Sequence, residues 1–146
     1  MAKTKTQNFE NHTRIVPIYH GLAFGILVIN LLYWLYRTAA PFSFEHLVML
    51  LQAVALLIMF FYARVFALTV QDRVIRLEMR LRLGQVLPAD LQSRMKDLTV
   101  DQFVALRFAG DEELPDLVRK VLTDNLTDRK TIKRMVKNWQ ADFLRA

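Results

Sequence analysis

The sequence predicts an all-α fold, with a two-helix transmembrane hairpin whose second helix extends into a small cytoplasmic helical domain. Hydrophobic residues make up 53% of the 146 residues, and charged residues only 23%. Many apolar residues lie in two long runs in the first half of the chain. In the rest of the chain, single apolar residues recur at the spacing of a helix. Only 4 Gly and 4 Pro residues occur, which disfavours a turn-rich β protein. The absence of Cys excludes disulfides, thiolate metal sites and cysteine nucleophiles.

The first predicted span covers residues 15–36 and follows a polar N-terminal tail at residues 1–14. It contains no Asp, Glu, Lys or Arg. A helix of this length extends about 33 Å, which is enough to cross a hydrocarbon core of about 30 Å. Pro17 falls in the first turn, where its missing N–H costs little. The apolar run is too long for the core of a cleaved signal peptide, so we expect it to stay in the membrane.

The second predicted span covers residues 46–66, after a short outer loop at residues 37–45. Its first part carries no full charge, and Arg64 near its end can extend its side chain to the membrane interface. The two spans and their loop form an antiparallel hairpin over residues 15–70. Most of the 20 Lys and Arg residues lie from Arg64 onward, so the positive-inside rule places both termini in the cytoplasm.

Four polar residues inside the hairpin are predicted to contact one another between the helices. Folding the chain about Pro41 places Asn30 level with Gln52, and His20 level with Tyr62. An interhelical hydrogen bond in the membrane contributes about 0.6 to 2 kcal/mol. A polar pathway or a ligand site is the functional alternative.

Two further features of the hairpin bear on packing and on cofactors. Gly21 and Gly25 form a small-residue face for close approach to the second helix or to another chain. His20 and His46 are candidate single ligands of a haem or pigment metal, because neutral imidazole is a common axial ligand. The helical rise separates them by about 20 Å, so they cannot hold one haem together. We expect a hydrogen-bonding role for both, and no cofactor.

Residues 71–146 form the predicted cytoplasmic domain, into which the second helix continues as far as Leu83, with Gly84 as its stop. Asp72 with Arg76, and Glu78 with Arg82, are expected to form ion pairs one turn apart. The helix carries a wide apolar stripe made of Val70, Val74, Ile75, Leu77, Met79, Leu81 and Leu83. A stripe of this width predicts a partner helix from the same chain or from another.

Further helices account for the rest of this domain. Pro88 begins a helix over residues 88–98. Thr99 and Gln102 form a capping box that opens a helix over residues 100–109, closed by Gly110. The acidic run 111–113 supplies the first turn of a helix that ends at residue 122.

The last predicted helix covers residues 128–144, with Thr127 as its cap. Its apolar side carries Ile132, Met135, Val136, Trp139 and Phe143, and its basic face carries Arg129, Lys130, Lys133, Arg134 and Lys137. The basic face is open to three interpretations: a solvated face, a surface for anionic lipid head groups, or a contact for nucleic acid or an acidic protein. Nucleic acid is disfavoured because the same region also holds most of the 14 acidic residues.

No motif for catalysis or metal binding is found. The chain has no GxSxG elbow, no GxGxxG or phosphate-binding loop and no HExxH. His12, His20 and His46 are too scattered to form a metal site with neighbouring carboxylates. We therefore expect no catalytic residue, no metal site and no enzyme activity.

Three places in the sequence carry a family resemblance. They are the opening Gln7-Asn8-Phe9-Glu10-Asn11-His12, the Leu87-Pro88-Ala89-Asp90-Leu91 helix start with Val104-Ala105-Leu106-Arg107-Phe108-Ala109, and the closing Lys137-Asn138-Trp139 near Phe143 and Arg145. With the hairpin, they resemble an uncharacterised family of small bacterial membrane proteins, a domain of unknown function, over nearly the whole chain. The resemblance implies a bacterial inner-membrane protein with no established activity, and no functional residue is carried over.

The leading functional hypothesis is a non-catalytic membrane subunit or scaffold that presents a helical domain to the cytoplasm. Its expected partners are the lipid bilayer and other membrane-protein chains or further copies of itself. One alternative is a pigment- or haem-associated subunit of an electron-transfer or light-harvesting complex, with a single histidine as ligand. The other is a membrane-anchored adaptor that binds anionic lipid or nucleic acid through the basic last helix.

Overall fold

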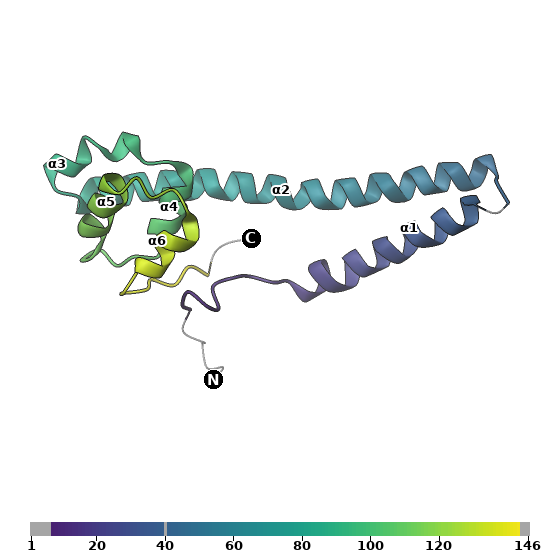
Figure 1. Ribbon diagram of the computed structural model, residues 1–146, viewed down its shortest axis with the longest axis horizontal. Coiled ribbons are helices and arrows are strands. Elements are labelled where there is room, and N and C mark those ends of the chain that lie inside the picture. The colour runs from purple at the N-terminus through teal and green to yellow at the C-terminus, as the bar shows by residue number, and fades with distance from the viewer. Residues whose placement is uncertain (1–6, 40, 144–146) are drawn as a thin grey trace. The chain divides into compact units, whose positions relative to one another are not determined.

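The computed structural model describes residues 7–39 and 41–143, and within them the chain is all-helical, as predicted. Figure 1 shows the helices in chain order. They are the π-helix η1 (Ile18–Ala23), α1 (Phe24–Ala39), α2 (Phe44–Val86), α3 (Ala89–Gln92), the 3-10 helix η2 (Met95–Asp97), α4 (Val100–Leu106), α5 (Leu114–Thr123) and α6 (Arg129–Met135).

The chain divides into two compact units. Residues Arg14–Leu68 form the first, here called the hairpin unit. The second, here called the core unit, combines Met1–Thr13 with Thr69–Ala146. Residues 7–13, which were expected to belong to a separate polar tail, therefore contribute to the core unit. The first part of that tail, residues 1–6, lies outside the described residues.

The hairpin unit contains a helical stretch at Ile18–Ala39, followed by the first part of α2. The first helix begins and ends about one turn later than the predicted 15–36. Pro17 occupies the N-cap of η1, where a residue without an N–H leaves no donor unpaired. The connection before Phe44 is shorter than the predicted loop at 37–45, because the carbonyl of Ser43 already accepts the N–H of Leu47 at 3.1 Å.

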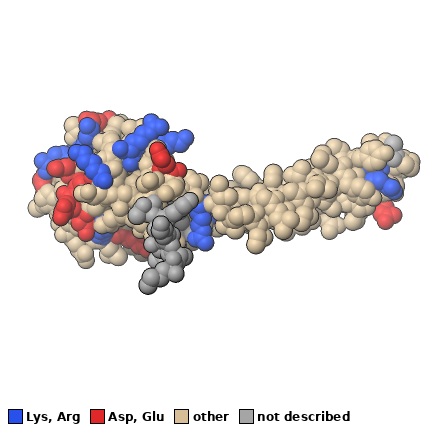
Figure 2. Space-filling view, turned by 90° about the horizontal axis from the view of Figure 1, so that it is seen from below, with Lys and Arg blue, Asp and Glu red and all other residues tan. Residues whose placement is uncertain are grey.

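Both long helices are apolar enough to cross a membrane, and in their most apolar windows the apolar side chains face outward. No residue is buried in the most apolar window of Ile18–Ala39, and only 6% of residues are buried in that of Phe44–Val86. Among the described residues of the hairpin unit, Ala53 is the one buried apolar residue. Figure 2 shows a largely uncharged surface over these helices, with Lys, Arg, Asp and Glu gathered toward the ends of that stretch.

The second helix does not stop at Gly84, as the sequence suggested, but continues to Val86. Gly84 is exposed, and a Cβ added there would meet nothing within 4 Å, so neither space nor backbone conformation requires a glycine. The helix ends just before Leu87-Pro88. The residue that precedes a proline is disfavoured in helical conformation, so Pro88 is the actual stop signal.

One side of α2 packs in the hydrophobic centre of the core unit. Ile75, Met79 and Leu83 are at most 5% exposed. They belong to one cluster with Leu87, Leu91, Leu98, Phe103, Val104, Ala105, Leu106, Ala109, Leu114, Leu117, Val118, Val121 and Ile132. The predicted stripe is thus divided, because Val70, Val74, Leu77 and Leu81 are exposed.

The helix predicted over residues 88–98 is broken into α3 and η2. The Gln92 side chain donates to the carbonyls of Leu87 at 2.9 Å and Gly84 at 3.2 Å, and the Ser93 hydroxyl donates to the Asp90 carbonyl at 3.1 Å. Side-chain bonds of this kind to nearby backbone compete with helix continuation. The break still leaves Leu91 and Leu98 buried in the core.

The capping box of α4 forms as predicted. Thr99 Oγ1 accepts the N–H of Gln102 at 3.3 Å, and Gln102 Oε1 accepts the N–H of Thr99 at 2.7 Å. Gln102 is only 3% exposed, and its Nε2 also donates to the carbonyl of Leu126 at 2.8 Å. One buried amide therefore caps α4 and fixes the chain after α5. The helix itself ends at Leu106, before the predicted residue 109.

Substituting Gln102 by leucine is expected to lower the free energy of unfolding by about 2 to 3 kcal/mol, because the Thr99 N–H and the Leu126 carbonyl lose their partner. Urea denaturation of the full chain in detergent, followed by hydrogen exchange in α4, measures the change. Thr99→Ser keeps the capping oxygen and serves as the control. A Gln102→Leu protein as stable as that control would show that the buried amide contributes nothing.

The long last helix over residues 128–144 is wrong: α6 ends at Met135, and its cap is Asp128 rather than Thr127. Val136 turns into extended backbone, after which the N–H groups of Lys137 and Asn138 donate to the Glu113 carboxylate, each at 3.0 Å. Residue 144, the predicted end of this helix, lies outside the described residues.

The segment after α6 pairs instead with the chain after α4. Trp139 forms a β-bridge with Ala109, and the N–H of Gln140 donates to the Phe108 carbonyl at 2.7 Å. Gly110 permits this approach, because a Cβ there would lie 3.2 Å from the Cβ of Asn138. Hydrogen bonds between distant segments thus replace those that a longer helix would have made.

Candidate functional site

The structure places Asn30 and Gln52 on the lining of one small cavity in the hairpin unit. Its volume is about 210 Å³, and Trp34 and Ala53 also line it. The two helices therefore meet near the register obtained by folding about Pro41. The hydrogen bond between the two amides stays a prediction.

The contacts of His20 and Tyr62 differ from the expected pair. His20 Nδ1 lies 3.1 Å from the N–H of Val16, which donates to it, while the Tyr62 ring contacts Phe61 and Phe66 on its own helix. Sequence reasoning overlooked Tyr19, which joins the two helices instead.

Tyr19 makes a specific contact between η1 and α2. Its hydroxyl donates to the Phe60 carbonyl at 2.5 Å, and the two rings stack with centroids 4.1 Å apart. An apolar cavity of about 460 Å³ lies beside this pair, lined by Tyr19, His20, Phe24, Leu57, Phe60, Phe61 and Arg64. The sequence did offer a way to find Tyr19. Folding the chain about Pro41 brings this turn of the helix close to the Phe60–Tyr62 region, and Tyr19 directly precedes His20, the residue singled out there.

Gly21 and Gly25 do not bring α2 close. A Cβ built on either glycine would meet nothing within 4 Å. The described part of the hairpin unit thus leaves this small-residue face open, so approach to the second helix is not its role here. Approach to another chain stays a prediction.

His46 lies beside a cation. Its Nε2 is 3.4 Å from Nη2 of Arg37, and its ring lies 5.9 Å from that of Trp34. Its Nδ1 is buried with no hydrogen-bond partner among the residues that the structure describes. A guanidinium next to an imidazole opposes binding of a metal cation by Coulomb repulsion. The neighbouring Arg37 therefore disfavours His46 as a ligand for a pigment metal, and Arg64, which lines the same cavity as His20, disfavours His20 for the same reason.

The predicted basic face is not one surface. Arg129 forms ion pairs with Asp72 at 2.9 Å and with Asp101 at 2.5 Å, so Asp72 pairs across the core unit rather than with Arg76. Likewise Arg82 pairs with Asp111 at 2.7 Å rather than with Glu78. Burial opposes the charged form of Arg129, but the hydrogen bonds to Asp101 and Asp72 outweigh it and raise the guanidinium pKa. Arg129 is therefore a structural cation.

The Asp128 carboxylate caps the N-terminus of α6, and its stabilisation of this helix depends on pH. The hydroxyl and the N–H of Thr131 both donate to its carboxylate at 2.7 Å, which lowers the pKa of Asp128 below its usual 3.8. Because this pKa is lowered in the folded chain, the stabilisation is present above pH 3.8 and is lost as the pH falls through the lower value.

Substituting Asp128 by alanine is expected to weaken protection of α6 from hydrogen exchange at neutral pH. The difference from the unsubstituted chain should shrink as the pH falls from 3.8 through the lowered pKa of the native carboxylate, because its protonation removes the charge to which Thr131 donates. Thr131→Ala removes one of the two donors and should give an intermediate loss. A difference that stays constant with pH would contradict the charge-dependent cap.

A group of aromatic and charged side chains in the core unit surrounds His12. Its ring lies 5.7 Å from those of Phe108 and Trp139 and 5.8 Å from that of Phe9. Phe108 and Trp139 stack with centroids 4.4 Å apart, and the Arg107 guanidinium lies 4.2 Å from the Phe108 ring centre. These side chains form the His12 cluster, in which three distant parts of the chain meet.

The two ring nitrogens of His12 contact groups of opposite hydrogen-bonding character. Its Nδ1 lies 2.6 Å from the Phe9 carbonyl, and its Nε2 lies 3.1 Å from the Lys133 ammonium. A carbonyl accepts and an ammonium donates, so a neutral ring with the proton on Nδ1 satisfies both contacts. Lys133 also lies 5.1 Å from the Phe108 ring centre, so it belongs to this cluster rather than to an outward basic face.

Gln7 ties the same segment to the C-terminal part of the chain. Its Nε2 donates to the Asp142 carbonyl at 3.0 Å, and its Oε1 accepts the N–H of Asp142 at 2.8 Å. Asp142 in turn pairs with Arg107 at 3.0 Å. The cluster thus clamps residues 7–12 against the chain after α4 and after α6. Sequence reasoning used these segments for the resemblance but missed that they meet.

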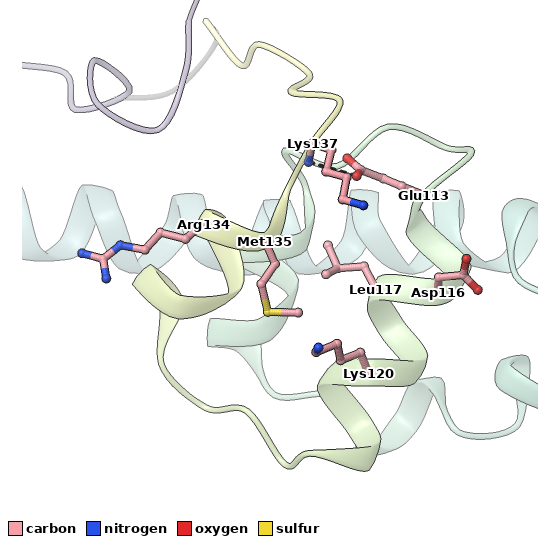
Figure 3. Close-up of a pocket in the computed structure, with 7 residues that line it drawn as sticks. All are labelled: Glu113, Asp116, Leu117, Lys120, Arg134, Met135 and Lys137. Atoms are coloured by element: carbon pink, nitrogen blue, oxygen red, sulfur yellow. Dashed lines mark hydrogen bonds between the residues drawn. The ribbon is translucent and has the colours of Figure 1, made fainter.

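A third cavity, of about 460 Å³, opens between α5 and the end of α6. Figure 3 shows its lining residues Glu113, Asp116, Leu117, Lys120, Arg134, Met135 and Lys137. The Glu113 carboxylate is held by the Lys137 N–H, as the figure shows, and Arg134 points away from the other labelled side chains. The cavity lining therefore combines acidic and basic groups without concentrating one sign of charge.

The fold defines a class of protein in which a long apolar helical pair is joined to a small helical domain. Over residues 1–146 the chain matches the family of unknown function DUF6526, and it belongs to that family. The comparisons with curated proteins and with solved structures found no match.

Proposed function

We propose that this chain is a non-catalytic integral membrane subunit or scaffold of the bacterial inner membrane. The hairpin unit spans the bilayer twice, both termini lie in the cytoplasm, and the core unit is presented there to other proteins. Its partners are the lipid bilayer and membrane-protein chains.

The outward exposure of the apolar helices supports this proposal most directly. Ile18, Ile29 and Tyr36 are each at least 69% exposed, although they lie along one helical stretch. In water, a surface this apolar would drive association, whereas lipid tails solvate it. A core helix of a soluble protein would instead be mostly buried.

The distribution of charge supports the orientation. Arg37 in the last turn of α1 and Glu45 in the first turn of α2 flank the connection between the helices, whereas most Lys and Arg residues lie from Arg64 onward. Short loops with few cations are translocated more readily than basic segments. Within the core unit, hydrogen bonds to carboxylate or backbone groups of other segments are made by Arg82, Gln102 and Glu113. These polar side chains therefore stabilise the fold, which supports a non-catalytic role.

The test is extraction of the natively expressed protein. We expect it in the membrane fraction after an alkaline carbonate wash, and in mild detergent as a colourless particle larger than one chain with defined companions. Recovery in the soluble fraction, or a lone monomer in native lipid, would reject the proposal. A visible absorption band lost in His20→Ala would instead support the pigment-associated subunit.

Topology is measured on single cysteines, since the chain has none of its own. Ser43→Cys should react with a membrane-impermeant maleimide from the outer side of spheroplasts. Lys130→Cys should react only after the membrane is opened. The reverse pattern would overturn the orientation.

A second candidate function is binding of anionic lipid head groups by exposed cations near α6. Lys130, Arg134 and Lys137 are exposed, and each cation near such a membrane contributes about 1 kcal/mol. Replacing Lys130 and Lys137 by Glu should release the membrane-inserted protein's core unit from vesicles that contain phosphatidylglycerol, read as increased protease access. Arg134 is kept, because its guanidinium lies 5.4 Å from the Phe9 ring centre. Lys133→Glu is not a suitable probe, because it would break the His12 contact.

A further inference from the structure

An apolar stripe remains exposed on the part of α2 that belongs to the core unit. Val70, Val74, Leu77 and Leu81 are 60%, 48%, 61% and 65% exposed. They recur at spacings of four, three and four residues, so they form one line along the helix. The opposite side, with Met79, packs into the unit's own core.

This line has the spacing of a coiled-coil seam. In the heptad frame that it defines, Val74 and Leu81 take position a, whereas Val70 and Leu77 take position d. Asp72 and Met79 then fall at position f, directly opposite the seam. In the central pair, Val74 at a and Leu77 at d match the preference for two strands, whereas Val70 at d and Leu81 at a reverse it.

The charges beside the seam indicate which partner fits. Arg73 takes position g, and Glu78 takes position e of the next heptad, and both are exposed. In a parallel pair of identical helices, a g residue faces the e residue five positions later on the other helix. Arg73 of each copy therefore meets Glu78 of the other, which gives two opposite-charge contacts.

The antiparallel arrangement fits less well. It sets g residues against g residues, which here are Arg73 and Arg80. Like charges in contact are unfavourable, so the sequence itself selects the parallel sense. Arg76, at position c outside the seam, is also exposed, and with Arg73 and Arg80 it makes this stretch too basic to be lipid-embedded surface.

We propose that residues 70–81 form a parallel two-stranded coiled coil with the same segment of a second copy of this chain. The proposal rests on the membrane insertion proposed above, because copies inserted with one topology direct α2 the same way, in agreement with the parallel sense that the charges select. Confinement to a membrane also raises the effective concentration of the two segments, which lets a short coil form.

Disulfide trapping in native membranes tests the seam. Leu77→Cys at position d should give a dimer on non-reducing gels after mild oxidation. Arg76→Cys is the matched control, because it is also exposed but lies one residue outside the seam. Several-fold more dimer from Leu77→Cys is the expected result. Equal yields, no dimer from Leu77→Cys, or a disulfide to a different protein would overturn the proposal.

Charge exchange on the Leu77→Cys background tests the register. Arg73→Glu or Glu78→Arg alone should reduce trapping several-fold, and the two together should restore it. Failure of the double variant to restore trapping would overturn the parallel pairing. Fractionation of the same samples separates the two proposals: trapping lost in protein that remains in the membrane rejects the coiled coil alone, whereas protein in the soluble fraction rejects the proposed function.

Discussion

Substituting Phe108 by alanine lowers the free energy of unfolding by about 3 to 5 kcal/mol, the usual cost of emptying a large buried aromatic site. Phe108 is fully buried, and its ring touches His12, Trp139 and the Arg107 guanidinium. Its loss removes the surface on which residues 7–12 are held. The segment should therefore detach before the rest of the core unit unfolds.

Two measurements check this expectation on the full chain in detergent. Urea denaturation gives the stability change, and limited chymotrypsin digestion reports cleavage after Phe9. Phe143→Ala is the matched control, because Phe143 is 62% exposed. The control should stay within about 0.5 kcal/mol of the unsubstituted chain. Unchanged protection of Phe9 in Phe108→Ala would show that the His12 cluster does not hold this segment.

The contrast between α4 and α6 shows which features were predictable from sequence. The capping box at Thr99 and Gln102 depends on residues three positions apart, so the sequence contains its whole cause. The end of α6 depends on Glu113, whose carboxylate captures the N–H groups of Lys137 and Asn138 from far along the chain. Helical spacing after Met135 therefore predicted neither the backbone nor the burial of Phe143, which is 62% exposed.

Some parts of the candidate sites could likewise be predicted from the sequence and others could not. Register about Pro41 brought Asn30 and Gln52 to one cavity, because a hairpin with a short connection leaves little freedom along its length. Which side chain turns toward the partner helix is a rotational question, and there Tyr19 took the place expected for His20. The His12 cluster joins segments that are far apart in the sequence, from Phe9 to Trp139, so no local sequence pattern predicts it.

Substituting Ile29 by arginine should impair membrane insertion, because an arginine at the centre of a spanning helix costs about 2.5 to 3.5 kcal/mol. Ile29 lies near the middle of Ile18–Ala39 and is 69% exposed. Arginine there disrupts little packing inside the chain. If this face of the helix were in water, Ile29→Arg would be neutral or would improve solubility. A loss of membrane insertion therefore indicates that Ile29 faces lipid.

The measurement compares the fraction of each protein that resists carbonate extraction from the membrane. Ala89→Arg adds the same charge at an exposed position in α3 and should behave as the unsubstituted chain. On the translocon scale a cost of about 3 kcal/mol corresponds to a change of about a hundredfold in the insertion equilibrium, partly offset by the second helix. If Ile29→Arg remained as fully inserted as Ala89→Arg, the outward apolar face of α1 would not be in contact with lipid, and the membrane assignment of that helix would fall.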